Sequence, residues 1–339
     1  MSVLATNAIT DASGGNTTTI NGYTPTVSNM AGRNRIINGN FDIWQRGTSF
    51  SDPNNTYTAD RFLVVPGGGT TGDTVSRQSF TAGQTDVPNE PSYFLRFSVG
   101  GTSANRVMHH RVEDVRTFAG QTCTLSFWAK ASVAHISTVE IQQNFGSGGS
   151  GAVTLSPVSY SMTTSWQKFT FTQTLPSIAG KTIGSSSYVY LAFIRSLPAS
   201  SVDIDIAQMQ FEAGSVATPF EHRQYGTELQ LCQRYYQSTY DYLAGDLPAS
   251  NVNAGCVDFT PINASDFFNF NYFVRMRTAP SVTTYRKNGG ATSQAQKADN
   301  SGTYISITTN VITAVGFDVT PATSESRNYR FHWVAEAEL

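Results

Sequence analysis

The segment Thr122-Cys-Thr-Leu-Ser-Phe-Trp-Ala-Lys130 decides the fold class of this chain. Every second residue in it is small or apolar and shares one face: Cys123, Leu125, Phe127 and Ala129. This period of two is that of a half-buried β-strand. Trp128 falls on the other, polar face, beside Ser126. The segment therefore predicts a sandwich strand with one tryptophan on its polar side.

The same signals extend from residue 33 to residue 224. In 202–206 three apolar residues alternate with two aspartates, and the run 188–194 is apolar on both faces, as expected inside a two-layer sandwich. Asn38-Gly39 and the glycine-rich run 146–151 are turn or loop signals. Many short strands separated by such turns predict an antiparallel β-sandwich of the jelly-roll type over 33–224.

The period changes after residue 224. Thr227 has the form of a helix cap, and Gln230 three residues on completes a capping box. Apolar and aromatic residues at helical spacing follow, so we expect one short helical connector over 225–242. Strand patterns resume beyond it and predict a smaller antiparallel sandwich over 243–339. The predicted fold class is all-β, with two tandem β-sandwiches joined by one short helix.

Residues 1–32 consist mainly of Thr, Asn, Ser and Gly, with few large apolar side chains. Such a segment cannot bury enough surface to offset the entropy lost on ordering, so alone it should be an extended arm. We expect it to become ordered by docking on another subunit or another protein.

Composition excludes several classes of protein. Only 14% of the residues are charged and the formal net charge is −2, so nothing steers the chain toward nucleic acid or an anionic membrane. The three cysteines have no paired spacing, which argues against a disulfide framework and a zinc site. The chain shows no signal-peptide pattern and no apolar run of the ~20 residues that span a bilayer. We expect a protein made in a cytoplasm, with no nucleic-acid partner and no membrane insertion.

Few residues suggest chemistry. His109 and His110 are adjacent, so in a strand they would point to opposite faces, and no further ligand lies at metal spacing. Asp203 and Asp205 share a strand face at a backbone separation of roughly 6.6 Å, near that of an inverting glycosidase pair. Glycosidases place the two carboxylates on different elements, so solvent-facing positions or ligands of a structural calcium are the better interpretations. No catalytic residue is predicted.

Four aromatic residues are candidates for carbohydrate binding: Trp44, Tyr57, Trp128 and Trp166. An exposed ring among hydroxyl-bearing side chains could stack on a sugar ring. The alternative for the tryptophans is burial in a core, or under a neighbouring sheet, loop or subunit, and this is the commoner role near strand ends. Trp333 alternates with Phe331 and Tyr329 and is expected in the core of the second sandwich.

Several segments resemble a domain common in phage tail and appendage proteins. They follow one another in that domain's order: 33–41, 44–48, 58–62, 125–130, 164–167, 210–214, 218–221 and the closing 228–236. Val274-Arg-Met-Arg277, Ala279-Pro280 and the end at 329–333 resemble the module that often follows, and 11–22 resembles a leader of the same proteins. The resemblance implies a virion protein whose arm, residues 1–32, docks on other virion proteins.

In layout, 33–224 is also similar to the jelly-roll carbohydrate-binding modules of families 4 and 9. The matching elements are 38–41, 93–97, 125–130, 166–167 and 202–205. This resemblance implies a two-sheet sandwich, in some members with a structural calcium, which here would fall on Asp203 and Asp205. It also implies a face for host-surface polysaccharide and no catalysis.

The sequence thus predicts a non-enzymatic bacteriophage virion protein, a tail or head fibre that contacts host-surface glycans. A homotrimer is expected, because fibres gain avidity by repeating weak sites. Two rival functions stay open: a capsule or glycan depolymerase, and a capsid decoration protein without glycan affinity.

Overall fold

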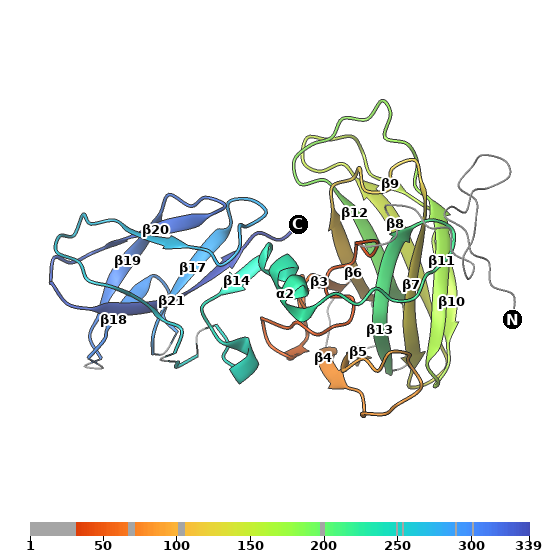
Figure 1. The fold of residues 1–339 in the computed structure, drawn as a ribbon, viewed down its shortest axis with the longest axis horizontal. Helices are drawn as coiled ribbons and strands as arrows, with labels where there is room; N and C mark the ends of the chain where they lie inside the picture. Colours follow the sequence, from red (N-terminus) through yellow and green to blue (C-terminus); the bar gives the residue numbers. More distant parts are fainter. Residues whose placement is uncertain are drawn as a thin grey trace, which may run out of the picture.

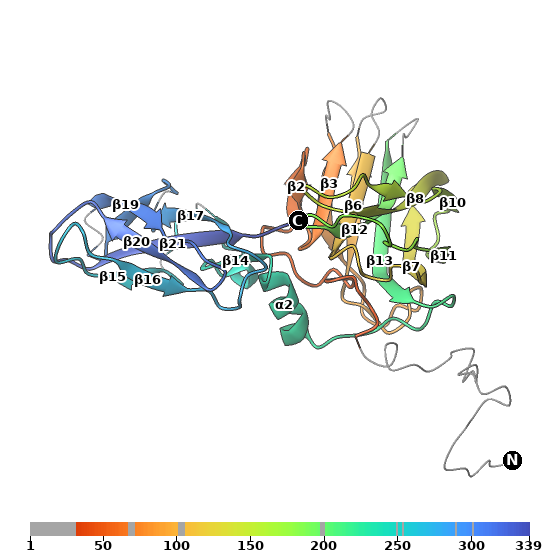
Figure 2. The same ribbon diagram turned by 90° about the horizontal axis from the view of Figure 1, so that it is seen from above.

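The structure is a computed structural model that describes residues 32–66, 72–100, 106–196, 201–248, 250–252, 254–288, 290–299 and 302–339. The predicted arm over 1–32 lies outside this part of the chain, except for Gly32. The described residues are nearly all β, as predicted, and they form two domains that lie side by side (Figures 1 and 2).

The first domain is a sandwich of two antiparallel sheets. One sheet contains, in spatial order, β1 (Ser49–Ser51), β4 (Thr74–Ser79), β5 (Tyr93–Val99), β13 (Val202–Ala213), β7 (Thr122–Ala131) and β11 (Gln167–Thr174). The other contains β10 (Val158–Met162), β8 (His135–Asn144), β12 (Tyr188–Ser196), β6 (Arg106–Glu113), β3 (Phe62–Pro66) and β2 (Thr56–Tyr57), with β9 (Val153–Thr154) paired to β8. We call them the six-stranded and the seven-stranded sheet. The strands β6, β7 and β8, and again β11, β12 and β13, alternate between the sheets, which is the jelly-roll pattern.

Apolar side chains from both sheets fill the space between the layers. On β7 the predicted inner face is fully buried: Cys123, Leu125, Phe127 and Ala129 are all 0% exposed. Phe127 crosses to the opposite sheet, where its ring centre lies 5.5 Å from that of Tyr160 and 6.4 Å from that of Phe193. Each such buried ring stabilises the fold by roughly 1.5–3 kcal/mol.

The helical connector is shorter than predicted. The helix α2 spans Tyr225–Gln233, and its N-cap residue Gln224 makes no side-chain capping bond. The prediction of a capping box at Thr227 and Gln230 is therefore wrong, because both residues lie inside the helix. After α2 the strand β14 (Tyr236–Ser238) already pairs with a strand of the second domain, and the short 3-10 helix η1 (Tyr242–Ala244) follows. No helix in the described ranges is long and apolar enough to cross a membrane.

The second domain is arranged around its last strand, β21 (Tyr329–Glu336). This strand pairs with β14, β15 (Val257–Phe259), β17 (Ser281–Arg286) and β18 (Gln294–Lys297). Beyond β18 the order continues through β19 (Tyr304–Asn310), β20 (Gly316–Pro321) and β16 (Phe268–Asn271). Trp333 lies in the core at 1% exposure, as predicted, and its ring centre is 5.8 Å from that of Phe317.

Two arginines of the first domain lie where the domains meet. The guanidinium of Arg61 is 1% exposed, lies 3.5 Å from the ring centre of Tyr235 and pairs with Glu338. The guanidinium of Arg46 lies 3.7 Å from the ring centre of Tyr236, and its Nη2 is 3.0 Å from Oε1 of Glu338. Each cation thus has both an aromatic face and a carboxylate. We call these five residues the joint.

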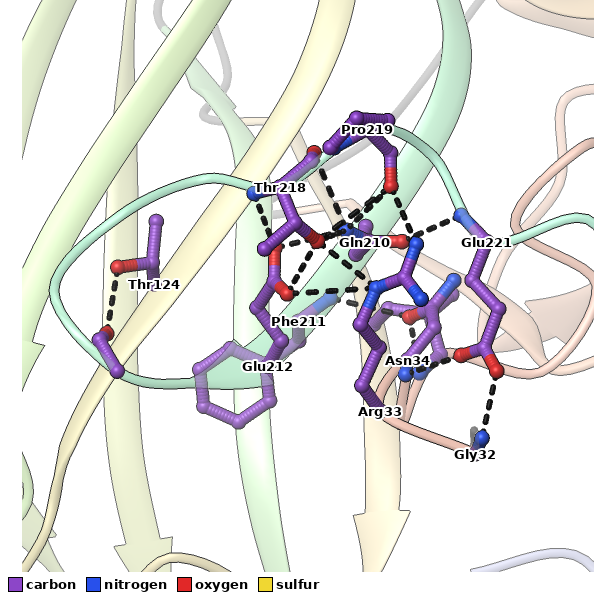
Figure 3. A network of polar contacts seen from close by, with 12 residues as sticks. Gly32, Arg33, Asn34, Thr124, Gln210, Phe211, Glu212, Thr218, Pro219 and Glu221 are labelled. Atoms are coloured by element: carbon purple, nitrogen blue, oxygen red, sulfur yellow. Dashed lines mark hydrogen bonds and ion pairs between the residues drawn. The ribbon is translucent and has the colours of Figure 1, made fainter. Parts of the chain in front are cut away.

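The first described residues, 32–37, form a strap that is fixed against the end of β13 (Figure 3). Glu212 is 0% exposed and accepts the backbone N–H of Thr218 at 2.9 Å and its hydroxyl at 2.6 Å. The same carboxylate lies 3.7 Å from Nε of Arg33. Glu221 accepts two backbone N–H groups of the strap, at 2.5 and 2.7 Å. The strap is therefore held by charge-assisted hydrogen bonds to Glu221 and by an ion pair with the buried Glu212.

Candidate functional site

The outer face of the six-stranded sheet collects most of the residues that the sequence marks as candidates. Because side chains alternate along a strand, Trp128 and Lys130 point outward from β7 while their neighbours fill the core. On β13 the same rule turns Asp203 and Asp205 outward. In the register of the sheet Asp205 lies opposite Lys130, and Ala207 lies opposite Trp128.

An aromatic cluster stands on this outer face. Trp166 lies just before β11, and its ring centre is 5.3 Å from that of Phe80 and 5.4 Å from that of Phe94, which it meets edge-on. Trp128 packs against the same cluster, together with the buried Val87. Both tryptophans are half-buried, so part of each ring is accessible. We call Phe80, Phe94, Trp128 and Trp166 the aromatic platform.

The loop that joins β4 to β5, residues 80–92, supports one side of the platform. Its ends are closed by a hydrogen bond of 3.0 Å from the Phe80 N–H to the Ser92 carbonyl. Gln208 on β13 donates its side-chain amide to the carbonyl of Pro88 at 2.6 Å, which ties the loop to the sheet. The residue Gln208 lies at a bulge in β13 and has a φ of 48°, so the bulge aims its side chain at the loop. The platform is thus a supported surface.

Charged side chains border the platform. Arg96 on β5 donates two hydrogen bonds to Asp205, at 2.7 and 2.9 Å, and this contact raises the pKa of Arg96. Nζ of Lys130 is 3.8 Å from the same carboxylate and 5.2 Å from the ring centre of Trp166. Lys130 and Arg96 keep about a third of their side-chain surface exposed, at 30% and 32%. The border therefore offers hydrogen-bond donors next to an apolar ring, the combination that orients a polar ligand.

The geometry disagrees with a calcium site at Asp203 and Asp205. Both oxygens of Asp205 already accept hydrogen bonds from Arg96, and Asp203 lies 3.9 Å from the same guanidinium. A calcium ion needs six to eight oxygen ligands, and a guanidinium between the two carboxylates would repel it. No group of three or more His, Cys, Asp or Glu side chains suited to a metal occurs in the described part of the chain. The same pairing removes Asp205 as a free carboxylate for glycoside hydrolysis.

Two of the predicted sugar-contacting residues lie elsewhere. Trp44 is 1% exposed in the core of the first domain, and its indole N–H donates to the Phe41 carbonyl at 2.8 Å. Its ring therefore has no face open to a ligand, and we withdraw it from the candidates. Tyr57 lies beside the joint, where its hydroxyl donates to the Leu339 carbonyl at 3.0 Å. Neither residue belongs to the aromatic platform.

Local sequence patterns do not mark Phe80, Phe94, Arg96 and Lys130 as site residues. Three of them lay in recognised strand patterns, and the alternation of 93–99 would have turned Phe94 and Arg96 away from the core. Nothing local to Phe80 shows that its loop folds back over the sheet. The one further signal was the two-residue spacing of Trp128 and Lys130, which already places them on the same face.

A cysteine and a histidine meet in the second domain, at a distance of 3.1 Å between Sγ of Cys256 and Nε2 of His332. Thr239 accepts the Trp333 N–H at 3.0 Å, so its own hydroxyl proton is free to donate to Nδ1 of His332, also at 3.0 Å. The other nitrogen then carries the ring proton and donates it to the Val252 carbonyl at 3.1 Å. In this tautomer the imidazole cannot accept the thiol proton, and burial raises the pKa of Cys256 to about 11. The pair is not arranged as a nucleophile and base.

Comparisons with known proteins show likeness in structure only. No family model matches the chain, and no curated protein does. The chain is similar to the enzymatically active domain of bacteriophage CBA120 tailspike protein 4 at 16% identity and a TM-score of 0.35, over 53% of this chain and 21% of that one. It thus spans about a fifth of the tailspike chain.

Two carbohydrate-binding modules are similar at the same level. A family 4 module shares 17% identity with a TM-score of 0.33, over 52% of this chain and 98% of that one. A family 11 module from Clostridium thermocellum, in complex with a mixed-linked tetrasaccharide, shares 13% identity with a TM-score of 0.32, over 51% and 99%.

Proposed function

We propose that this protein is a non-catalytic glycan-binding component of a bacteriophage particle, a tail or head fibre that contacts host-surface polysaccharide through the aromatic platform. The observation that carries the proposal is that two half-buried tryptophans, Trp128 and Trp166, pack on one cluster of a supported face, beside Lys130 and Arg96. Aromatic faces bind the apolar side of a sugar ring, and the bordering donors reach its hydroxyl groups.

The place in a virion is supported by different observations. The segments that resemble phage appendage domains follow one another in the same order as in those domains. Together they span nearly the whole chain, including the arm expected to dock on other virion proteins. The low charge content, 14%, suits a subunit that buries surface against neighbours. In a homotrimer, three copies of a weak platform would act together, because linked sites raise the effective concentration of one another.

Binding to a neutral glycan panel tests the platform. We expect the full chain to bind at least one neutral polysaccharide fragment, and Trp166→Ala or Trp128→Ala to weaken binding by about tenfold or more. Tyr304→Ala is the matched control, because it removes a 50% exposed aromatic ring from the second domain. Unchanged affinity in both tryptophan variants would exclude the platform as the binding site.

Assays on the same purified chain distinguish the rival functions. Release of reducing ends from capsular polysaccharide by the purified chain would show a depolymerase and overturn the non-catalytic assignment. A complete absence of glycan binding, with incorporation into particles retained, would favour a decoration protein. Electron microscopy of particles labelled at the end of the second domain would test the assignment to a projecting fibre.

A further inference from the structure

A cavity of about 710 Å³ opens at the end of the first domain, away from the aromatic platform. Its walls come mainly from four segments: the strap, the end of β6, the turn after β6 (114–121) and the helix α2 with the residues that flank it. The volume lies within the roughly 300–1,000 Å³ that small-molecule sites occupy. None of the predicted site residues lines it.

The lining of this cavity is strongly cationic. It carries five arginines and two acidic residues: Arg35, Arg111, Arg116, Arg223 and Arg234, with Glu113 and Asp114. The chain as a whole has a formal net charge of −2, so the positive charge of this cavity differs in sign from the charge of the whole chain. Clustered guanidinium groups in a concave site concentrate anions from solution.

Two of these arginines are already occupied by the protein itself. Arg234 donates to both oxygens of Glu113, at 3.1 and 2.9 Å. Arg223 donates to both oxygens of Glu228, at 3.1 Å each, and to a strap carbonyl at 2.9 Å. Their fork geometry is therefore used to hold α2 and the strap in place.

Of the other three arginines, Arg111 donates to the Leu339 carbonyl, whereas Arg35 and Arg116 are available to a ligand. Arg35 is exposed and has no ion-pair partner among the described residues, and it lies 5.7 Å from the ring centre of Phe118. Arg116 is 62% exposed, and among the described residues its guanidinium contacts only Asp114, at 3.3 Å. Two accessible guanidinium groups thus stand at the cavity, and such groups suit a carboxylate.

A buried histidine adds an unsatisfied polar atom to the lining. His110 is 0% exposed and its Nε2 accepts the Ile37 N–H at 3.3 Å. Its Nδ1 must then carry the ring proton, since burial lowers the pKa of His110 and keeps it neutral. This Nδ1 has no partner among the described residues. An unpaired buried donor costs about 1–3 kcal/mol, so an oxygen of a ligand would satisfy it.

We propose that this cavity binds the carboxylate-bearing residue of an acidic polysaccharide, a uronic or sialic acid unit, through Arg35 and Arg116. The inference rests on the proposed glycan-binding function and names the substrate class for a second site. Guanidinium groups recognise carboxylates through paired hydrogen bonds.

Titration calorimetry on the full chain tests the proposal, with tetragalacturonate, tetramannuronate and disialic acid as the acidic probes. We expect at least one of them to bind, with an affinity that falls as salt is raised. The methyl ester of the bound probe keeps the sugar rings and removes the charge, and it should bind at least tenfold more weakly. The double variant Arg35→Ala/Arg116→Ala should lose at least tenfold in affinity for the acidic probe.

Matched variants separate this site from the platform. Arg327→Ala, at another exposed arginine, should leave acidic binding unchanged, and so should Trp166→Ala. Absence of binding for all three probes, equal affinity in the double variant, or displacement of the probe by equimolar inorganic sulfate would overturn the proposal. Loss of neutral glycan binding alone would overturn the platform and leave this site standing.

Discussion

Replacing Glu338 with glutamine tests whether the joint fixes one domain on the other. Glu338 is the carboxylate that both joint arginines share, and Arg61 beside it is 1% exposed. The change Glu338→Gln keeps the shape of the side chain but removes the negative charge that faces the buried Arg61 guanidinium, whose other contacts are a carbonyl, at 2.8 Å, and the Tyr235 ring. Breaking a buried ion pair by removing one partner costs about 3–5 kcal/mol. Because those two contacts remain, we expect the lower end, about 3 kcal/mol.

Urea unfolding followed by tryptophan fluorescence measures this loss. Docking stabilises the domain that unfolds first. The urea concentration at which that domain is half unfolded should fall by about 1.5 M, if its free energy of unfolding falls by about 2 kcal/mol per M of urea. The control Asp258→Asn breaks an exposed pair with Arg330, in which the two side chains are 47% and 34% exposed. Such a surface pair contributes about 0–1 kcal/mol, so the control should stay near the parent protein. Equal midpoints for Glu338→Gln and Asp258→Asn would refute the joint as a stabilising contact.

Three further changes probe other parts of the fold. Glu212→Gln should lower the unfolding free energy of the first domain by about 3 kcal/mol, because an amide N–H₂ would face a donor of Thr218. An unchanged melting temperature would contradict the network in Figure 3. Gly39→Ala should destabilise the bulge of β13, because the added Cβ would lie 2.1 Å from the Met209 carbonyl oxygen, and a normal melt would count against that packing. Burial lowers the pKa of His109 from 6.5 to about 3. The neutral ring therefore contributes its full stabilisation above pH 6.5, and this stabilisation is lost as the pH falls toward 3, by ~1.4 kcal/mol per pH unit. Urea unfolding at each pH should show a shallower loss of stability at acid pH in His109→Gln.

Local patterns predicted the strands well because a strand's period depends only on neighbouring residues. The inner face of β7 and the buried Trp333 follow from alternation alone. The N-cap was misplaced because Thr227 has cap chemistry in sequence, while the observed N-cap, Gln224, lies three residues earlier. A propensity signal of about 1 kcal/mol is easily outweighed by the tertiary contacts that position a connector.

The site was only half predictable, for a physical reason. Alternation placed Trp128 outward, but its association with Trp166 depends on how β11 pairs with β7, and the supporting loop at 80–92 folds over the sheet from far away in sequence. The role of Asp205 also depended on a distant residue, since Arg96 is 109 positions away. A carboxylate on a strand face suggests a bound cation. For Asp205 that cation is the Arg96 side chain of the protein itself.

The position of the joint explains how two domains and an open platform fit together. Tyr57 and Arg111 lie on the outer face of the seven-stranded sheet, and both contact the carbonyl of Leu339 at the end of the described chain. The second domain therefore reaches the outer face of the sheet opposite the one that carries Trp128 and Trp166, and its Leu247 also lies next to Gly47 before β1. Had it docked on the six-stranded sheet, its residues would have covered the half-exposed rings, and the platform would be an interdomain core. In the described structure the outer face around Trp128 and Trp166 therefore stays open to a ligand.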